Sequence, residues 1–306
     1  MSRRKQHGRP INGWMVIDKA EGMTSTDVVT RVKRLTQAQK VGHGGTLDPL
    51  ASGVLPIAMG EATKTVPYIM DAAKSYLFTI RFGEARDTDD AAGTVTAESA
   101  ERPTDAAILA ELPAFLGHIQ QRPPTYAAVK INGERAYDLA RRGETVELAS
   151  REVRIDELEL LGRPDADHAS FRMVCGKGAY VRAVARDLGL KLGCFAHVTA
   201  LRRTSVGAFD VADAISLETL AGVVENETLP QVLVSVATAL VGIPALAVTE
   251  PQALRLRAGQ SIRVPPQLLG ADDTAALTVR AMRSGDLIAL AHFESGELSP
   301  VRVFHL

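Results

Sequence analysis

The order of hydrophobic patterns along the chain is the feature that most restricts its fold. Residues 74–82 alternate, because every second side chain from Tyr76 to Phe82 is aromatic or aliphatic, which is the period of a strand. Residues 24–35 and 180–193 place apolar side chains three and four positions apart, which is the period of a helix. The two patterns mix without the strict βαβ order of a parallel sheet. The chain is therefore predicted to be an α+β protein with a mixed, largely antiparallel sheet flanked by helices.

The same reasoning predicts the remaining elements. Strands are predicted at residues 13–20, 53–60, 151–160, 169–175 and 197–209, and helices at 104–115, 134–143, 216–224 and 231–241. The helix at 24–35 is expected to begin near Ser25 or Thr26, and Thr104 is expected to cap the helix that follows it, since hydroxyl oxygens accept from free helical N–H groups. Asn132-Gly133 predicts the tight turn of a hairpin.

The length of 306 residues favours two domains of unequal size. From residue 246 onward the pattern changes to short strands and turns. We therefore expect a larger domain at 1–245 and a small β-rich domain at 246–306. The first 12 residues are basic and are expected to form an arm that orders only on binding a partner.

Cysteine usage and hydropathy exclude several classes of protein. Cys175 and Cys194 are isolated, which argues against a disulfide framework and a zinc site. The basic start of the chain has no apolar stretch behind it, so a signal peptide is not expected. The apolar residues 229–248 are interrupted by Pro and polar side chains, which favours a buried helix and a linker over a membrane span. A cytoplasmic protein is the expectation.

The formal net charge of −1 hides a segregation of charge along the chain. Residues 1–64 hold ten Lys and Arg against five Asp and Glu, whereas residues 71–111 hold four against nine. Because phosphate binding depends on the local field, a basic face for nucleic acid is compatible with a neutral total.

The segment GHGGTLDPLASGVL, residues 42–55, places Asp48 on a glycine-flanked loop before an apolar strand. Asp-Pro commonly opens a turn, and a capping role for Asp48 is one reading. The segment has neither the spacing of a phosphate-binding P-loop nor that of a dinucleotide site, and Ser52 is not on a nucleophile elbow. The acidic run Asp87–Asp90 could serve paired-carboxylate hydrolysis or form a solvated turn.

Several long blocks resemble the bacterial tRNA pseudouridine synthases of the TruB family. They include GHGGTLDPLASGVLPIAMGEATK, KSYLFTIRFGEARDTDDAAG, RPPTYAAVKINGERAYDLARRGE, CGKGAYVRAVARDLG and LRRTSVGAF. The blocks occur in the family's order between Gly13 and Phe209, and the tail resembles its small PUA-like domain more loosely. The resemblance implies isomerisation of the uridine that heads the T-Ψ-C sequence in the T-arm of tRNA.

By this resemblance Asp48 is the catalytic nucleophile, and Arg182 lies beside it and is held by Asp90, with Asp87 and Asp89 as neighbouring alternatives. The resemblance also implies a set of side chains around the flipped nucleotide. They are His43 in the place that the base leaves, Tyr76 against the base, Tyr180 and Leu201 as walls of the uracil pocket, and Lys64 and Lys130 at phosphates. From the residues alone, Tyr76, Tyr180 and Leu201 are typical of core positions, and His43 is typical of a turn. The two lysines are typical of a solvated surface.

The implied reaction uses no redox step and no net hydrolysis, so no cofactor and no metal are expected. The expected partner is the T-arm stem-loop of tRNA, recognised by shape and unstacked bases, with no membrane and no obligate protein partner. A non-catalytic RNA-folding protein and a metal-dependent ribonucleotide hydrolase built on residues 87–90 are the alternatives.

Overall fold

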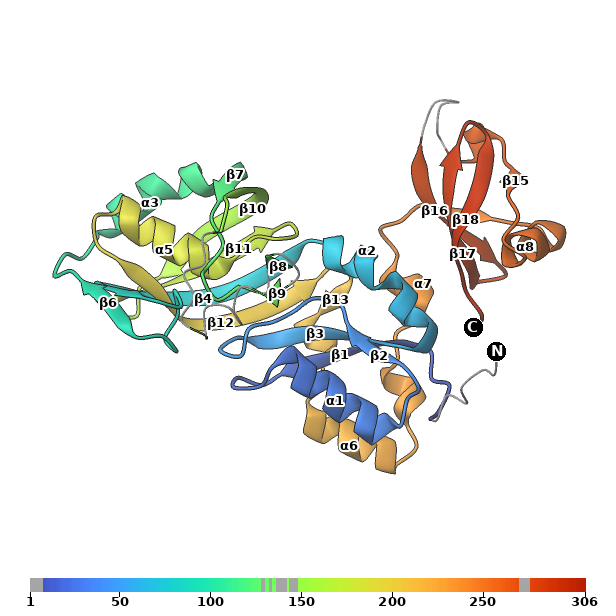
Figure 1. The fold of residues 1–306 in the computed structure, drawn as a ribbon, viewed down its shortest axis with the longest axis horizontal. Coiled ribbons are helices and arrows are strands. Elements are labelled where there is room, and N and C mark those ends of the chain that lie inside the picture. The colour runs from blue at the N-terminus through green and yellow to red at the C-terminus, as the bar shows by residue number, and fades with distance from the viewer. Residues whose placement is uncertain (1–7, 128–129, 132–133, 136–141, 143–147, 270–275) are drawn as a thin grey trace.

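The structure, a computed structural model, describes residues 8–127, 130–131, 134–135, 142, 148–269 and 276–306. Its centre is a nine-stranded sheet of order β1-β3-β12-β4-β11-β10-β7, with β2 paired to β3 and β13 to β12 (Figure 1). These strands are β1 (Gly13–Lys19), β2 (Val41–His43), β3 (Ser52–Met59), β4 (Lys74–Phe82), β7 (Gly117–Gln121), β10 (Arg151–Gly162), β11 (His168–Cys175), β12 (Ala196–Val206) and β13 (Phe209–Asp210). Among the described strand pairs of this sheet, β12–β3 alone is parallel, so the predicted α+β fold with a largely antiparallel sheet is confirmed.

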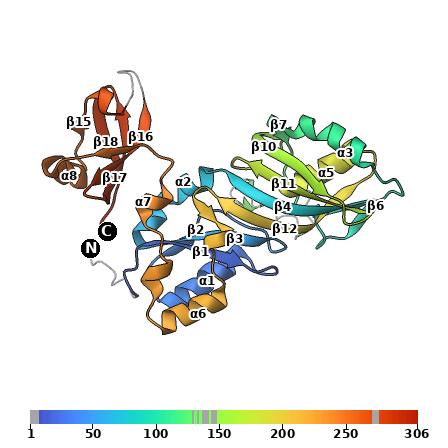
Figure 2. The same cartoon turned by 180° about the vertical axis from the view of Figure 1, so that it is seen from behind.

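Helices cover the two halves of this sheet. They are α1 (Ser25–Thr36), α2 (Val66–Asp71), α3 (Asp105–Glu111), α5 (Val181–Lys191), α6 (Leu217–Glu225) and α7 (Val236–Ala239). Figures 1 and 2 show α1 and α6 together beside β1, and α5 packs against β12 and β4. The apolar stripes of α1 and α5, such as Val28, Val32, Val184 and Leu188, join the sheet in one large core. Burial of these stripes is the main stabilising term for both helices.

Strand β1 is buried on both faces, which explains its nearly continuous apolar sequence. Met15 and Ile17 lie in the main core with the apolar stripe of α1. Trp14 and Val16 lie in a second core, which α2, α7 and the C-terminal strands complete. The strand therefore joins two parts of the molecule through alternate side chains.

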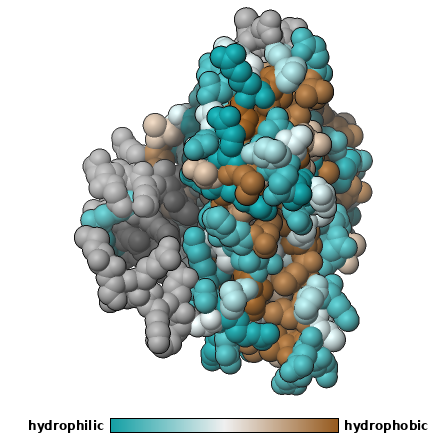
Figure 3. Space-filling view, turned by 90° about the vertical axis from the view of Figure 1, so that its right-hand side faces the viewer, coloured by the Kyte–Doolittle hydropathy of each residue, from teal (hydrophilic) through white to brown (hydrophobic). Residues whose placement is uncertain are grey.

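The C-terminal unit has a five-stranded sheet of order β14-β16-β17-β18-β15. Its elements are β14 (Ala245–Ala247), α8 (Glu250–Arg257), β15 (Ile262–Arg263), β16 (Leu277–Arg283), β17 (Asp286–Glu294) and β18 (Glu297–Val303). The unit has its own apolar core, and its half-barrel sheet is compatible with a PUA-like domain. The division at 245/246 stays a prediction. Figure 3 shows one face of the molecule, with apolar residues interspersed among polar ones.

The C-terminal unit packs on the larger one through side chains from both. Leu287, Leu290 and Phe304 lie in the second core with Trp14. Arg280 donates to the carbonyl oxygens of Ile243 and Ala237, at 2.7 and 2.9 Å. These contacts hold β16 against the segment that leads into the unit.

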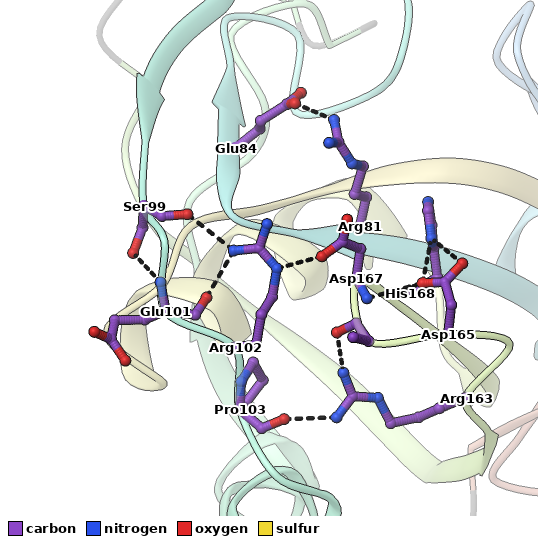
Figure 4. A network of polar contacts seen from close by, with 11 residues as sticks. Arg81, Glu84, Ser99, Glu101, Arg102, Pro103, Arg163, Asp165, Asp167 and His168 are labelled. Atoms are coloured by element: carbon purple, nitrogen blue, oxygen red, sulfur yellow. Dashed lines mark hydrogen bonds and ion pairs between the residues drawn. The ribbon is translucent and has the colours of Figure 1, made fainter.

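At the end of the main sheet away from the C-terminal unit, a polar network lies beside the small hairpin of β5 (Glu84–Arg86) and β6 (Val95–Glu98) (Figure 4). Arg102 donates to Asp167 and to the carbonyl oxygen of Ser99. Arg163 donates to the carbonyl oxygen of Pro103 at 2.6 Å. The two arginines therefore tie the chain after β6 to the loop between β10 and β11.

Helix α1 begins at Ser25, as predicted, and its cap is the residue before Ser25. Thr24 is its N-cap and forms a capping box with Asp27, whose carboxylate accepts from the Thr24 backbone N–H at 3.0 Å. The hydroxyl of Ser25 instead accepts from the backbone N–H of Leu47 at 2.9 Å. The Thr-x-x-Asp spacing was the signal that distinguishes Thr24 from its neighbours.

The predicted helix at 231–241 is wrong in extent. A 3-10 turn covers Leu229–Val232, and α7 covers only Val236–Ala239. Val234 between them exchanges two backbone hydrogen bonds with Trp14, at 2.7 and 2.8 Å. This tertiary pairing extends the chain where the local pattern favours a helix.

Helix α8 was not predicted, because only Ala253 and Leu256 of its eight residues are buried. The predicted helix at 134–143 lies mostly outside the described residues, and its first two residues are a strand. They form β9 (Glu134–Arg135), which pairs with β8 (Lys130–Ile131), as a hairpin requires. The turn at 132–133, the side chain of Lys130 and the first seven residues of the basic arm also lie outside the described residues. In the part that the structure describes, no helix is long and apolar enough to cross a membrane.

Candidate active site

The loop between β2 and β3 carries Asp48, and this loop and the start of β3 together need glycine at three positions. A Cβ on Gly44 would lie 2.8 Å from Ile69 Cγ2, and Gly45 has a φ of +138°. Gly53 has a φ of +103°, and a Cβ there would lie 2.1 Å from a backbone oxygen of β12. Since only glycine fits such close approaches and positive φ values, the glycines fix the course of the loop.

Asp48 faces the first turn of α5. The Nε and Nη2 atoms of Arg182 each lie 2.9 Å from Asp48 Oδ2. The arginine side chain is 4% exposed and the aspartate side chain 32%. The buried cation therefore holds a partly exposed carboxylate through charge-assisted hydrogen bonds.

Arg182 is itself fixed by two further segments. It donates to the carbonyl oxygens of Thr88 and Tyr126, at 2.9 and 3.0 Å. Its Nη1 also lies 3.5 Å from Asp90 Oδ2. Because these partners surround the planar guanidinium, its orientation toward Asp48 is set by the fold.

The three carboxylates of residues 87–90 have different partners. Asp90 faces Arg182, and its Oδ1 accepts from the Thr88 hydroxyl at 2.7 Å. Asp89 pairs with Arg186 at 3.0 Å, and Asp87 accepts from a backbone N–H at 2.8 Å. The geometry selects Asp90 as the acidic neighbour of Arg182. The run forms a loop that holds two arginines of α5.

A cavity of about 480 Å³ lies next to Asp48 and Arg182. This volume is within the range of about 300–1,000 Å³ that small-ligand sites occupy. Its wall includes Asp48, Arg182, Asp90 and His43, together with the first turn of α1. His43 ends β2, and its Nδ1 accepts from the Gly45 N–H at 3.4 Å. The structure thus brings His43, Asp48 and Arg182 to one cavity.

Tyr76, Leu201 and Tyr180 are not in the wall of this cavity. Tyr76 on β4 and Leu201 on β12 share one face of the sheet and pack against the main core. Burial raises the pKa of the Tyr76 hydroxyl, and the charge of Asp48 acts in the same direction.

Tyr180 precedes α5 and is anchored through its backbone. Gln121 accepts from its N–H at 2.8 Å and donates to its carbonyl oxygen at 3.2 Å. Its ring lies 5.1 Å from the Arg151 guanidinium, a cation–π contact. A role in a uracil pocket stays a prediction.

Lys64 lies at the contact with the C-terminal unit. Its Nζ donates to Glu61 at 2.6 Å and to the carbonyl oxygen of Val303 at 2.8 Å. It also lies 5.8 Å from the centre of the Phe304 ring. In this structure the ammonium serves that contact, and its predicted contact with an RNA phosphate stays a prediction.

The described residues contain no group of three or more His, Cys, Asp or Glu side chains placed to hold a metal ion. Two basic side chains approach the Asp48 loop instead. Lys19 is fully buried and donates to the carbonyl oxygens of Met23, at 2.8 Å, and Pro49, at 3.4 Å. Burial lowers its pKa to about 8, and Asp48 opposes that shift. Arg203 approaches from β12.

Comparison with known proteins places this site in a family. Residues 33–181 match the description "TruB family pseudouridylate synthase (N terminal domain)", and residues 182–241 match "tRNA pseudouridylate synthase B C-terminal domain". The tRNA pseudouridine synthase B of Gluconacetobacter diazotrophicus is 53% identical, over 98% of this chain and 99% of its own. That of Caulobacter vibrioides is 51% identical over the whole of both chains. The chain belongs to the TruB family of pseudouridylate synthases.

The predicted family is therefore confirmed, and the TruB-family chain is an isomerase. Among solved structures, an H/ACA RNP bound to a substrate RNA containing 2′-deoxyuridine superposes with a TM-score of 0.75. It is 22% identical and covers 100% of this chain and 92% of that one. At this identity the likeness shows the fold alone, and it confirms the predicted pseudouridine synthase fold.

Sequence reasoning missed Lys19, Arg186 and Arg203 in this TruB-family chain. Lys19 stands in a strand that is otherwise largely apolar, and both Lys19 and Arg203 are fully or almost fully buried. A charged residue in such a strand is unusual, because an uncompensated buried charge is costly. For Lys19, the charged residue in an apolar strand was the signal available in the sequence.

Proposed function

We propose that this chain converts the uridine that heads the T-Ψ-C sequence in the T-arm of tRNA to pseudouridine, with Asp48 as the nucleophile. The carrying observation is the partly exposed Asp48 carboxylate, which the buried Arg182 holds at the wall of the cavity. The relatives that are about half identical over their full length carry the name tRNA pseudouridine synthase B, and this supports tRNA as the substrate.

The reaction moves a glycosidic bond within one nucleotide. The bond from ribose C1′ to uracil N1 breaks, the base turns, and a bond from C1′ to C5 forms. N1 gains a proton and C5 loses one, so the composition of the nucleotide is unchanged. A single ionised carboxylate near the nucleotide suffices for nucleophilic catalysis, and Asp48 has the exposure and the charge partner for it.

Arg182 holds the Asp48 carboxylate at the wall of the cavity. Its guanidinium is almost fully buried, and the carbonyl oxygens of Thr88 and Tyr126 hold its plane. Asp90 balances part of its charge from the other side. This preorganisation needs no rearrangement when charge develops during the reaction.

The target uridine is stacked in a folded arm, so it has to be extruded, at a cost of a few kcal/mol. In the proposal Tyr76 contacts the extruded base, and stacking there contributes about 1–3 kcal/mol. Leu201 and Tyr180 bound the uracil pocket, and His43 fills the space that the base leaves. The position of His43 on the cavity wall with Asp48 supports this part of the proposal.

The decisive experiment measures tritium release from a T-arm stem-loop that carries uridine labelled at C5. We expect release with the wild-type chain and a loss of at least about 1,000-fold with Asp48→Asn, because an amide is a poor nucleophile. Asp87→Asn serves as the matched control, because it is exposed and lies outside the cavity wall.

The same variants separate the other candidate functions. Asp48→Asn is expected to bind the stem-loop with a Kd within about threefold of the wild type, because Arg182 and the cavity wall remain. Normal release by Asp48→Asn contradicts the nucleophile assignment. Strand cleavage that stops on chelation would instead indicate a hydrolase.

A further inference from the structure

Arg203 is a buried cation beneath the loop that carries Asp48. Its side chain is 1% exposed. Its Nε donates to the carbonyl oxygen of Val54 at 2.8 Å, and its two terminal nitrogens lie 3.3 and 3.1 Å from those of Thr46 and Gly45. One guanidinium therefore holds the loop both before and after Asp48.

The backbone of Arg203 is locked against the same loop. Arg203 pairs with Gly53 in the single parallel contact between β12 and β3. A Cβ on Gly53 would lie 2.1 Å from the Arg203 carbonyl oxygen. Because no side chain fits between the two strands, the position of Arg203 relative to the loop is fixed.

Arg203 also faces Tyr76 on the neighbouring strand. The two residues are direct partners in the β4–β12 register, so their side chains project from the same face of the sheet. Burial raises the pKa of the Tyr76 hydroxyl, and the charge of Arg203 acts against that shift. The other charged or titratable groups that act on this pair are Asp48, Lys19, Lys74 and Cys175.

We propose that Arg203 is a positioning residue that fixes the Asp48 loop and the Tyr76 hydroxyl relative to each other during pseudouridine formation. The inference rests on the proposed function, because it uses the roles given there to Asp48 and Tyr76. Arg203 acts through these two residues, by way of its hydrogen bonds to loop carbonyl oxygens on one side and its strand pairing with Tyr76 on the other.

The charge of Arg203 argues for such a role over simple packing. Within the described part of the chain, no carboxylate forms an ion pair with Arg203. Replacement of a buried cation by an apolar side chain of similar volume is often neutral or stabilising. An apolar residue cannot supply the planar set of N–H donors of the guanidinium, which reaches three carbonyl oxygens at once.

The first test compares Arg203→Met and Arg203→Lys with Arg202→Met. Arg202 is the matched control, because it lies next to Arg203 and pairs with Asp18 at 2.7 Å. We expect Arg203→Met to lower the single-turnover rate about 100-fold, since misplacement by about 1 Å can cost that much. The Kd for the stem-loop should stay within about threefold, and Arg202→Met should retain a rate within about threefold of the wild type.

Arg203→Lys keeps the charge but cannot make all three carbonyl contacts, and we expect it to fold and to remain at least tenfold slow. If Arg203→Met does not fold, the lysine variant decides the question. A lysine variant as fast as the wild type overturns the proposal.

A double-mutant cycle with Tyr76→Phe distinguishes positioning from packing. If Arg203 positions the hydroxyl, the double variant should be about as slow as the slower single variant, because the two act as a unit. Effects that multiply overturn the proposal. Activity in Asp48→Asn would defeat the proposed function itself, whereas an inactive Asp48→Asn with normal Arg203 variants defeats this inference alone.

Discussion

Arg182 contacts the same oxygen of Asp48 through two nitrogens, at 2.9 Å each, although 134 positions separate the residues in the chain. One partner is almost fully buried and the other is partly open to the cavity. Arg182 therefore holds the Asp48 carboxylate in a fixed position at the wall of a cavity that has the volume of a small-ligand site.

Arg182→Lys should lower the single-turnover rate by about 100-fold or more. A lysine ammonium cannot bond Asp48 and the carbonyl oxygens of Thr88 and Tyr126 together. The rate is measured by tritium release, with the Kd of the stem-loop measured in parallel. Arg186→Lys, one helical turn later and paired with Asp89, should lose less than about tenfold. Equal losses in both variants would argue against a specific role for Arg182.

Asp90→Asn should destabilise the fold by about 1–3 kcal/mol and lower the rate about tenfold. The amide retains the bonds to Thr88 and Ala92 but leaves Arg182 with less compensation of its buried charge. Urea unfolding gives the stability and tritium release gives the rate. Asp87→Asn, on the same loop, should change both by much less. An unchanged stability in Asp90→Asn would show that the 3.5 Å contact between Asp90 and Arg182 does not stabilise the fold.

Asp89 should make stability depend on pH in a defined window. Burial raises its pKa from 3.8 to about 6, although Arg186 acts against the shift. Between about pH 4 and pH 6 the folded chain holds more protons at this site than the unfolded chain, so its contribution to stability falls as pH rises. The stability of Asp89→Asn relative to the wild type should therefore increase across this window, by an amount on the order of 2 kcal/mol.

Urea unfolding of both chains at one-unit intervals from pH 4 to pH 8 measures this difference. Asp87→Asn, an exposed neighbour, separates the effect of burial from the loss of a charge on this loop. A difference between wild type and Asp89→Asn that stays constant over the window would contradict the prediction.

Gly53→Ala should destabilise the fold by at least about 3 kcal/mol. Its φ is +103°, and the added Cβ would meet the Arg203 backbone at 2.1 Å. Gly222→Ala is the matched control, because Gly222 lies inside α6 with open space around it and alanine favours the helix by about 1 kcal/mol. Thermal unfolding should move in opposite directions for the two variants. A Gly53→Ala chain as stable as the wild type would rule out this close approach of β3 and β12.

Local patterns predicted most elements of the larger sheet, because periods of 2 and 3.6 are properties of a few adjacent residues. The strand at 74–82 and the Thr104 cap are present as expected. The prediction failed where distant partners act: Val234 is extended because it pairs with Trp14. The short helix α8 was missed because only two of its residues, Ala253 and Leu256, are buried.

The sequence by itself determined the α+β class, the family and the glycine-flanked loop around Asp48, because these depend on residue types in order along the chain. Tertiary structure alone decided that Asp90 faces Arg182 while Asp89 faces Arg186. It also decided that Lys19 and Arg203 lie beneath the loop. Strand order and register bring these groups together from positions far apart, and hydrogen bonds and charge pairs act only over a few ångströms.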